Sequence, residues 1–293
     1  GYWEVETPYL MERPAPEANI DPLQVRLGPQ EVYYLHTSPE MGMKKALLGG
    51  HDRIFQICKV FREEELEEIH NMEFTMVEWY GKGTYLAAMD EVTALVRHVA
   101  KALGGGEDRR FSGSWHAFDI AHLFETTISV NPFGLTRGQF LEALRAAGFG
   151  GVDEADSWND LFFKVLIQEI EPAIKRESPC YLVDWPCSIS SMAKRKDADR
   201  VERFELYMDG LEIANGYTEL LDRAEQEERF RSDLAERERR GMPVFPIDTS
   251  FLGAISRLEG PIFGVSVGLD RLLMAILGEG SIDAVLFDRV RRW

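Results

Sequence analysis

The sequence predicts an α+β fold in which an antiparallel β-sheet is flanked by helices. The first observation is a hairpin: "RFELYMDGLEIANGY", residues 203–217, contains two β-rich runs separated by Asp209-Gly210, a strong turn signal. The second is a helix from Tyr85 to Leu103, where apolar residues recur every three or four positions. The third is that no glycine-rich phosphate loop follows a strand. Long strands with helices between them therefore favour α+β over a doubly wound parallel sheet.

The other elements follow from strand composition and helix-start signals. β-rich runs predict strands at 31–36, 54–61, 73–80 and 181–185, and the hairpin extends over 203–219. Helices are expected to start at Thr136, Ser157 and Asp222, and the pairs Ser157/Asp160 and Asp222/Glu225 have capping-box spacing. A last strand runs into a helix across "GVSVGLDRLLMAIL", and the clearest loops are 14–22 and 103–108.

Composition limits the functional class. The 293 residues carry a net charge of −17, which weighs against broad nucleic-acid or anionic-membrane binding but leaves a local basic patch or an ATP site open. Charged residues interrupt every long apolar run, so no signal peptide or membrane span is predicted. Cys58, Cys180 and Cys187 have no metal or redox spacing and are expected to be reduced core thiols in a cytoplasmic protein.

A carboxylate lies in the middle of the predicted strand in "HNMEFTMVEWY", residues 70–80. Strand alternation places Glu78 on one face with Phe74, Met76 and Tyr80. An ionised carboxylate among aromatic side chains is costly unless a cation meets it. That cation is either a structural Arg or Lys or a cationic ligand. Taken alone, the simpler interpretation is favoured, in which Arg62 neutralises Glu78 or Glu64 and the other loop acids face solvent.

Two more carboxylates share a face of the predicted hairpin. With Asp209-Gly210 as the turn, Glu205 lies one diagonal step from Glu212, so a proton or a cation is needed between them. Mg²⁺ with a polyphosphate would serve, and a solvent-facing edge is the alternative at even odds. Asn215, Tyr217 and Glu219 have the opposite parity. A bulge near Gly216 would bring both sets to one pocket, and Asn215-Gly216 could instead form a second turn.

A third candidate is "GVSVGLDRL", residues 264–272. Gly264 and Gly268 permit a close approach of a ligand to the backbone, and Arg271 starts the last helix. Taken alone, a structural Arg271 bonded to Asp270 or to a carbonyl is the favoured interpretation.

In this order the three stretches resemble the signature motifs of class II aminoacyl-tRNA synthetases. "EVETP" resembles the end of motif 1 with Pro8, "FREE…HNMEFTMVEWY" resembles motif 2 and "GVSVGLDR" resembles motif 3. "TSPE", "HN-EFTM-EWY" and "E-ANGYTEL" are similar to the lysine-specific subgroup. A lone catalytic core of this kind, with "HTSPEMGMKK" and "RGMPVFPID", most resembles the elongation factor P–lysine ligase family, the truncated lysyl-tRNA synthetase paralogues.

The resemblance covers nearly the whole chain and implies one class II catalytic domain over 1–293. No anticodon-binding domain precedes "EVETP", and the chain opens at Gly1 inside a strand-like run, so the start of motif 1 is expected to be missing. Family members adenylate (R)-β-lysine with ATP and transfer it to a lysine side chain of elongation factor P. They are usually homodimers built partly through motif 1, whose helix is not found before Pro8, which puts dimer formation by this chain in question.

The resemblance also implies residue roles. Arg62 and Arg271 would be catalytic and bind ATP, and Glu64, His70, Asn71 and Phe74 would complete the ATP site, with Phe74 stacked on adenine. The amino acid would meet Ser38, Glu40, Glu78, Tyr80, Asn215, Tyr217, Glu219 and Ser266, and Mg²⁺ would lie on Glu205 and Glu212. Glu40 would bind the amino group nearer the carboxylate, and Glu78, Tyr80 and Glu219 would bind the distal ammonium. On this view Glu78 is tolerated because the substrate supplies its counter-charge.

Two departures from the family pattern bear on the substrates. Residues 63–68 carry five glutamates, with Glu68 where the ligases often have a basic residue, so the loop is expected to repel phosphates and favour a protein acceptor over tRNA. Ser266 and Ser38 could reshape the pocket for a β-amino acid. The competing hypotheses are a tRNA-charging enzyme and a non-catalytic paralogue that binds lysine or adenylate. No residue is identified that deprotonates the acceptor amine.

Overall fold

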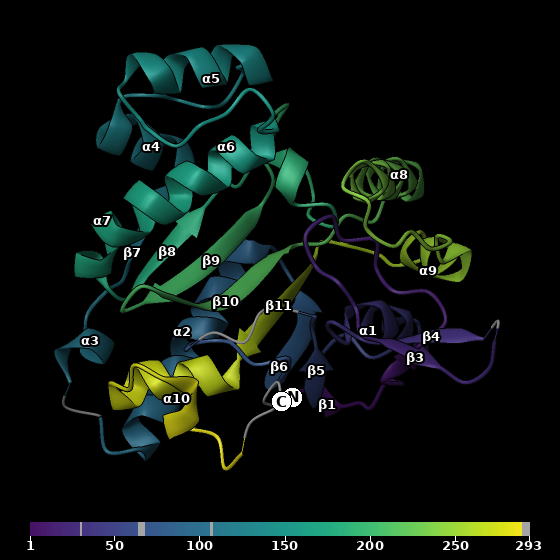
Figure 1. Ribbon diagram of the computed structural model, residues 1–293. Helices are drawn as coiled ribbons and strands as arrows, with labels where there is room; N and C mark the ends of the chain where they lie inside the picture. Colours follow the sequence, from purple (N-terminus) through teal and green to yellow (C-terminus); the bar gives the residue numbers. More distant parts are fainter. Residues whose placement is uncertain (30, 64–67, 106–107, 289–293) are drawn as a thin grey trace.

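The computed structural model describes residues 1–29, 31–63, 68–105 and 108–288, and within them one large sheet dominates (Figure 1). Its strands are hydrogen-bonded in the order β1 (Trp3–Glu4), β5 (Ile54–Phe61), β6 (Glu73–Lys82), β11 (Ile262–Gly268), β10 (Leu211–Thr218), β9 (Arg203–Met208), β8 (Cys180–Val183) and β7 (His116–Asp119). Neighbours are antiparallel except at the two edges, where β1–β5 and β7–β8 are parallel. The predicted α+β fold with a largely antiparallel sheet is confirmed, and the two short parallel edge pairs were not predicted.

Helices α2 (Tyr85–Ala102) and α10 (Leu269–Leu277) contribute to the main core on one face of this sheet. The apolar stripe of α2, with Val92 and Val96, shares this core with Val265 and Val267 of β11 and with Phe204 of β9. Side chains alternate along a strand, so the same strands turn their other residues to the opposite face. Apolar packing on one side thus directs the polar positions of β6, β9, β10 and β11 to the other side.

The opposite face is covered at both ends. Over β7–β9 lies a second core that includes the stacked rings of Phe124 and Phe162, 4.8 Å apart. It is built by helices α4 (Ile120–Ile128), α5 (Arg137–Ala146), α6 (Trp158–Val165) and α7 (Glu171–Ile174), and α3 (Arg109–Ser112) precedes it in the chain. These helices leave the middle of the face uncovered.

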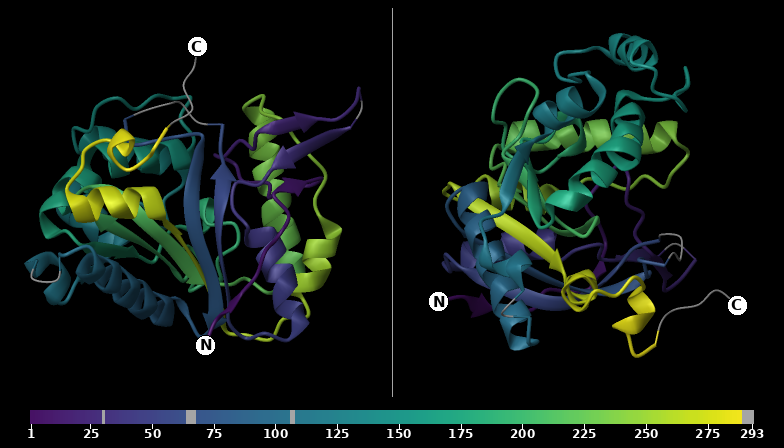
Figure 2. Two further views of the ribbon diagram at one scale, coloured as in Figure 1. Left: turned by 90° about the horizontal axis from the view of Figure 1, so that it is seen from below. Right: turned by 90° about the vertical axis from the view of Figure 1, so that its left-hand side faces the viewer.

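At the other end are α1 (Glu40–Ala46), α8 (Arg223–Arg239) and α9 (Thr249–Ile255). A small antiparallel sheet, β2 (Leu10–Met11), β4 (Val32–Leu35) and β3 (Gln24–Arg26), lies beside α8 (Figure 2). The rings of Tyr34 and Phe245 meet at 5.5 Å between this sheet and the segment after α8. This sheet was not predicted, apart from its strand at 31–36.

The start signals for three helices are confirmed. Thr136, Ser157 and Asp222 are N-caps, and Ser157 forms a full capping box with Asp160. The box expected from Asp222 and Glu225 is incomplete, because only the bond from the Glu225 N–H to the Asp222 side chain forms. Cys58 and Cys180 are buried free thiols, but Cys187 is half-buried and not a core residue as expected.

The hairpin is confirmed at its turn and corrected at its bulge. Met208 pairs with Leu211 and Tyr207 with Glu212, as predicted. The register then shifts between Glu212 and Ala214, so Glu205 lies opposite Asn215. The face switch required near Gly216 is therefore at Ile213, and a second turn at Asn215-Gly216 is wrong because β10 continues to Thr218.

Candidate active site

A cavity of about 470 Å³ lies over the uncovered middle of the sheet. Its walls come from β6, β9, β10 and β11, from α1 and α8, and from the segments at 17–20 and 188–192. The predicted residues that line it are Ser38, Glu40, Arg62, His70, Asn71, Phe74, Glu78, Tyr80, Glu205, Glu212, Asn215, Tyr217, Ser266 and Arg271. Glu219 lies just behind this wall, and Glu64 lies outside the described residues. Residues far apart in the sequence thus meet at one site.

Glu78 lies deep in the cavity, 3% exposed. It lies between Gln56 of β5 and Ser266 of β11 in the sheet, and its Oε1 accepts a 2.7 Å hydrogen bond from the Tyr80 hydroxyl. Burial and then the charge of Glu40 raise the pKa of Glu78 well above its usual value. Among the described residues, no Lys or Arg forms an ion pair with it. The simpler interpretation, in which Arg62 neutralises Glu78, is therefore not supported.

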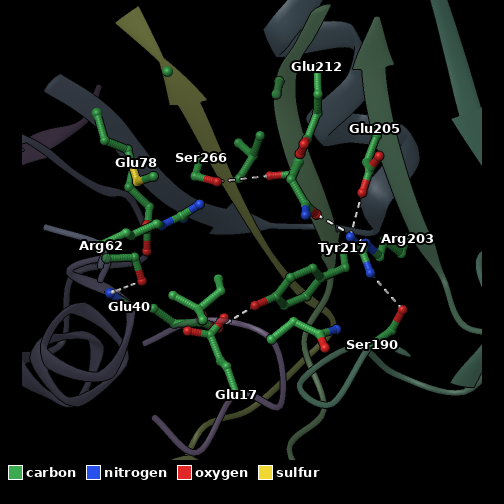
Figure 3. A pocket seen from close by; sticks show the side chains of 18 of the residues that line it. Glu17, Glu40, Arg62, Glu78, Ser190, Arg203, Glu205, Glu212, Tyr217 and Ser266 are labelled. Carbon is green, nitrogen blue, oxygen red and sulfur yellow. Dashed lines mark hydrogen bonds and ion pairs between the residues drawn. The ribbon is translucent and has the colours of Figure 1, made fainter. Parts of the chain in front are cut away.

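Unlike Glu78, for which the substrate was expected to supply the counter-charge, the neighbouring acids have a counter-charge in the protein. Lys44 of α1, only 1% exposed, forms ion pairs with Glu40 and, at 2.5 Å, with Glu219 Oε2. The Tyr217 hydroxyl donates to Glu40 Oε1 from the other side (Figure 3). Sequence reasoning missed Lys44, although its position four residues after Glu40 on a helix was a usable signal.

The acids still outnumber the cation. Glu40, Glu78 and Glu219 are three carboxyl groups around one ammonium. Burial raises the pKa of Glu219 to about 8 although Lys44 opposes the shift, and no donor among the described residues bonds its Oε1. A buried group of this kind gains most from a cationic ligand.

Gly264 of β11 makes room for this cluster. A Cβ at this position would be 2.3 Å from Glu219 Oε1 and 2.5 Å from Tyr80 Cε1. The atoms that approach this glycine belong to the protein's own side chains, so the close approach of a ligand to Gly264 stays a prediction.

Arg62 and Arg271, which the motifs predict to bind ATP, both line the cavity. The Arg62 guanidinium lies 5.2 Å from the centre of the Phe74 ring, and its Nε donates to the Thr37 carbonyl at 3.4 Å. Arg271 donates to the carbonyls of Ile69 and Glu212 at 3.5 and 3.3 Å, and these are long, weak bonds. No carboxylate in the described part of the chain forms an ion pair with either guanidinium. Only weak hydrogen bonds to two carbonyls therefore support a structural role for Arg271.

His70 and Asn71 also line the cavity. Asn71 Nδ2 donates to the Glu73 carbonyl at 2.7 Å, while its buried Oδ1 has no hydrogen-bond partner within the described residues. Asp270, the alternative partner of Arg271, instead accepts from the Thr75 N–H at 2.6 Å.

The bulge at Ile213 brings Glu212 and Asn215 to the same face as Glu205. Arg203, which sequence reasoning missed, binds Glu205 at 2.5 Å, Ser190 Oγ at 2.9 Å and Asn215 Oδ1 at 3.3 Å (Figure 3). Burial and the charge of Glu212 raise the pKa of Glu205 to about 8. Ionisation of both carboxyl groups would therefore leave a negative charge that Arg203 does not balance and that a bound cation would relieve. A solvent-facing edge is excluded for Glu205, which is 4% exposed.

Two further acids line the cavity and were not predicted. Glu17 lies in the loop 14–22, where burial and the charge of Glu40 raise its pKa while Arg62 lowers it. Asp233 lies on α8, where burial raises its pKa to about 7. The loop is held over the cavity by Arg237, whose Nη1 donates to the carbonyls of Glu17 and Ile20.

This fold, with two arginines and paired carboxylates on one sheet face, is that of a class II aminoacyl-tRNA synthetase core. The family described as tRNA synthetases class II (D, K and N) matches residues 1–289. Among curated proteins, the elongation factor P–(R)-β-lysine ligases of Salmonella gallinarum and Salmonella dublin are each 33% identical over 301 aligned residues, covering 100% of this chain and 90% of the relative. The chain therefore belongs to the elongation factor P–(R)-β-lysine ligase family, and the predicted resemblance is confirmed.

No helix among the described residues combines the length and apolar character that a membrane crossing requires.

Proposed function

We propose that this chain, an ATP-dependent amino-acid ligase by family, activates (R)-β-lysine or lysine as an adenylate and transfers it to a lysine side chain of elongation factor P. The observation that carries the proposal is the buried surplus of carboxylates beside two arginines in one cavity. A diamino acid has the complementary pattern, two ammonium groups and one carboxylate.

The amino-acid site is the cluster around Glu78. The distal ammonium of the bound amino acid would lie among Glu78, Tyr80 and Glu219. The other amino group of the substrate would lie near Glu40, which Tyr217 orients. Asn215 and Arg62 would hold the carboxylate, and the planar guanidinium suits this bidentate contact. Ser38 and Ser266 lie at the wall and would shape the pocket for the position of the amino group.

ATP would bind on the side of Arg62 and Arg271. Phe74 offers an aromatic surface for adenine, with His70, Asn71 and Glu64 completing the site as the motifs imply. Glu205 and Glu212 fit Mg²⁺, because carboxylate oxygens are its ligands and the ionised pair carries surplus negative charge. When bound, Mg²⁺ supplies charge neutralisation on the polyphosphate.

In the first step the substrate carboxylate oxygen attacks the α-phosphorus in line, the bond to the β-phosphate oxygen breaks, and pyrophosphate leaves. Arg62 and Arg271 stabilise the charge that develops on the phosphate oxygens. In the second step the acceptor amine, after losing a proton, attacks the carbonyl of the mixed anhydride. An amide forms and AMP leaves.

The acceptor assignment is supported by charge as well as by the relatives' name. Residues 63–68 carry five glutamates, and the net charge of −17 disfavours a polyanionic acceptor such as tRNA. The relatives are named for elongation factor P. We also expect a homodimer in the cytoplasm, as the family pattern implies.

The test is intact-mass measurement of elongation factor P incubated with the enzyme, ATP, Mg²⁺ and either amino acid. The expected product has the mass of one added lysyl residue, and it forms faster with (R)-β-lysine. An Arg62→Ala variant should give no product. Robust labelling of total tRNA in place of elongation factor P would overturn the acceptor assignment. Absence of ATP–pyrophosphate exchange with both amino acids would instead indicate the non-catalytic paralogue.

A further inference from the structure

Lys44 is enclosed behind the amino-acid pocket and does not line the cavity. Its Nζ contacts Glu40 and Glu219, lies 3.8 Å from Met192 Sδ, and lies 5.4 Å and 5.9 Å from the ring centres of Tyr217 and Phe251. A side chain so enclosed cannot touch the substrate. Any effect it has on the reaction acts through the two carboxylates it bridges.

The charge of Lys44 reaches all the amine-binding acids. Burial would lower the pKa of Lys44, but Glu219 and Glu40 raise it overall, so the ammonium stays charged. In turn, its positive charge lowers the pKa of both Glu219 and Glu78, against the larger effect of burial. Lys44 therefore favours the ionised form of the groups that are to meet an ammonium.

The charge of the ionised pocket is neutralised by one kind of ligand. Three carboxylates and one lysine give the ionised pocket a charge of −2 from Glu40, Glu78, Glu219 and Lys44. A diamino acid brings two ammonium groups, and its carboxylate is met separately by Arg62. A monoamino acid would leave one buried carboxylate unmatched, which is costly.

We infer that Lys44 is a positioning residue that favours the ionised form of Glu78 and Glu219 and sets the charge of the ionised pocket to match a diamino acid. This inference rests on the proposed function. Protons and the ammonium groups of the substrate compete for the same carboxylates. Without Lys44, protons compete better near neutral pH.

The pH dependence of amino-acid binding depends on the titratable groups that face Lys44. Glu40 lies on the same helix as Lys44. Tyr217 lies on β10, and Glu219 directly follows that strand. Glu78 and Tyr80 lie on β6. From α9 the contact is Phe251, which does not titrate. In this set, burial raises the pKa of Glu219 to about 8 and raises the pKa of Glu78 well above its usual value.

The experiment is calorimetric titration of the full chain with lysine and with (R)-β-lysine between about pH 6 and 9. The wild type should bind more tightly as pH rises, since binding displaces protons. Lys44→Met should bind about tenfold more weakly near pH 7, with its affinity curve displaced to higher pH so that the loss shrinks toward pH 9. Its KM for ATP should change less than about twofold, because the contacts of Lys44 include neither Arg62 nor Arg271.

Lys45→Met is the matched control. Lys45 is the next residue on α1, but it pairs with Asp248 and is 37% exposed, so its pH profile should equal that of the wild type. A uniform loss for Lys44→Met at every pH would show a merely structural role and overturn the inference. Lys44→Arg keeps the charge and should keep the wild-type position of the curve even if Lys44→Met does not fold. A displaced Lys44→Arg curve would overturn the inference as well.

The two proposals fail in different ways. If the wild type binds neither amino acid, the proposed function is wrong, and this inference falls with it. If the wild type binds and Lys44→Met has the same profile, only the inference is wrong.

Discussion

Gly264 is the residue at which the space for the side chains of Glu219 and Tyr80 is most tightly fixed. An added Cβ would overlap Glu219 Oε1 and Tyr80 Cε1 at 2.3 and 2.5 Å. We expect Gly264→Ala to cost about 1–3 kcal/mol of stability and to raise the KM for lysine strongly, because both side chains must move. Thermal unfolding and ATP–pyrophosphate exchange measure the two effects.

Gly253→Ala is the control for that substitution. Gly253 lies in α9 with nothing within 4 Å of its would-be Cβ. Alanine in a helix is favoured over glycine by about 1 kcal/mol, so this variant should be as stable as the wild type or more so. Equal lysine KM values for Gly264→Ala and Gly253→Ala would contradict the crowding argument.

Glu78 is a residue where function opposes stability. Its burial without an ion pair from the described residues raises its pKa, so the ionised form destabilises the folded state as pH rises. We expect Glu78→Gln to raise the melting temperature near pH 8 and, at the same time, to raise the KM for lysine. Glu73→Gln, half-exposed on the same strand, should change neither quantity. A lower melting temperature for Glu78→Gln would count against this account.

At the scale of single residues, the sequence predicted which side chains meet at the site, but it did not predict which basic side chains pair with the acids. Glu78, Arg62 and Arg271 were found because strand parity and motif order mark them. Lys44 and Arg203 each have one partner close in the chain, Glu40 and Glu205. Their further contacts, of Lys44 with Glu219 and of Arg203 with Ser190 and Asn215, could not be predicted. Such pairings depend on tertiary packing, which local spacing does not encode.

At the scale of elements, the bulge at Ile213 decides which side chains of β10 face the cavity. The need for a face switch followed from alternation, but its place did not. Gly216 looked suited because it lacks a side chain, yet a Cβ there would be 2.7 Å from the Phe204 ring. That glycine serves packing against β9, and the register shift falls three residues earlier.

Helix α8 carries an element-scale prediction. Arg237 is fully buried and binds the Glu17, Ile20 and Pro243 carbonyls and the Asp21 carboxylate. We expect Arg237→Met to destabilise the protein by about 3–5 kcal/mol, because it leaves buried acceptors without a donor. It should also speed proteolytic cleavage within 14–22, which thermal unfolding and limited proteolysis would detect.

Arg231→Met is the comparison variant on the same helix. Arg231 is 71% exposed and pairs only with Glu227 among the described residues. An exposed pair of this kind is worth about 0.3–0.5 kcal/mol, so the melting temperature should barely change. A similar loss of stability in both variants would mean that the buried arginine does not hold the loop.

At the scale of the whole molecule, the sheet separates two functions. One face is closed by α2 and α10 over an apolar core, and the other is left open between two groups of helices for the cavity (Figure 1). The fold class and most strands of the sheet were predictable because long β-runs and helix caps are local signals. The parallel edge strands β1 and β7 were not, because each is four residues or fewer and is defined by its neighbour.

The acids of the cavity together make the stability of the whole protein depend on pH. Glu205 and Glu219 have pKa values of about 8 and Asp233 of about 7, all raised from ordinary carboxyl values mainly by burial. The folded state therefore holds protons that the unfolded chain has already lost, so stability falls as pH rises through these values. We expect the melting temperature of the ligand-free protein to fall between about pH 5 and 8 and to change little above that range, where these carboxyl groups are ionised in both states.

Ligands should reduce this fall, because bound ammonium groups and Mg²⁺ with ATP replace the protons at the same carboxylates. Differential scanning calorimetry across that pH range, with and without saturating lysine and Mg²⁺–ATP, measures both slopes. The Glu219→Gln variant should have a shallower ligand-free slope, and Glu154→Gln, on an exposed acid, should match the wild type. A melting temperature that rises with pH over this range would show that burial does not raise the pKa of these carboxyl groups, and the expectation that a bound cation replaces their protons would fail.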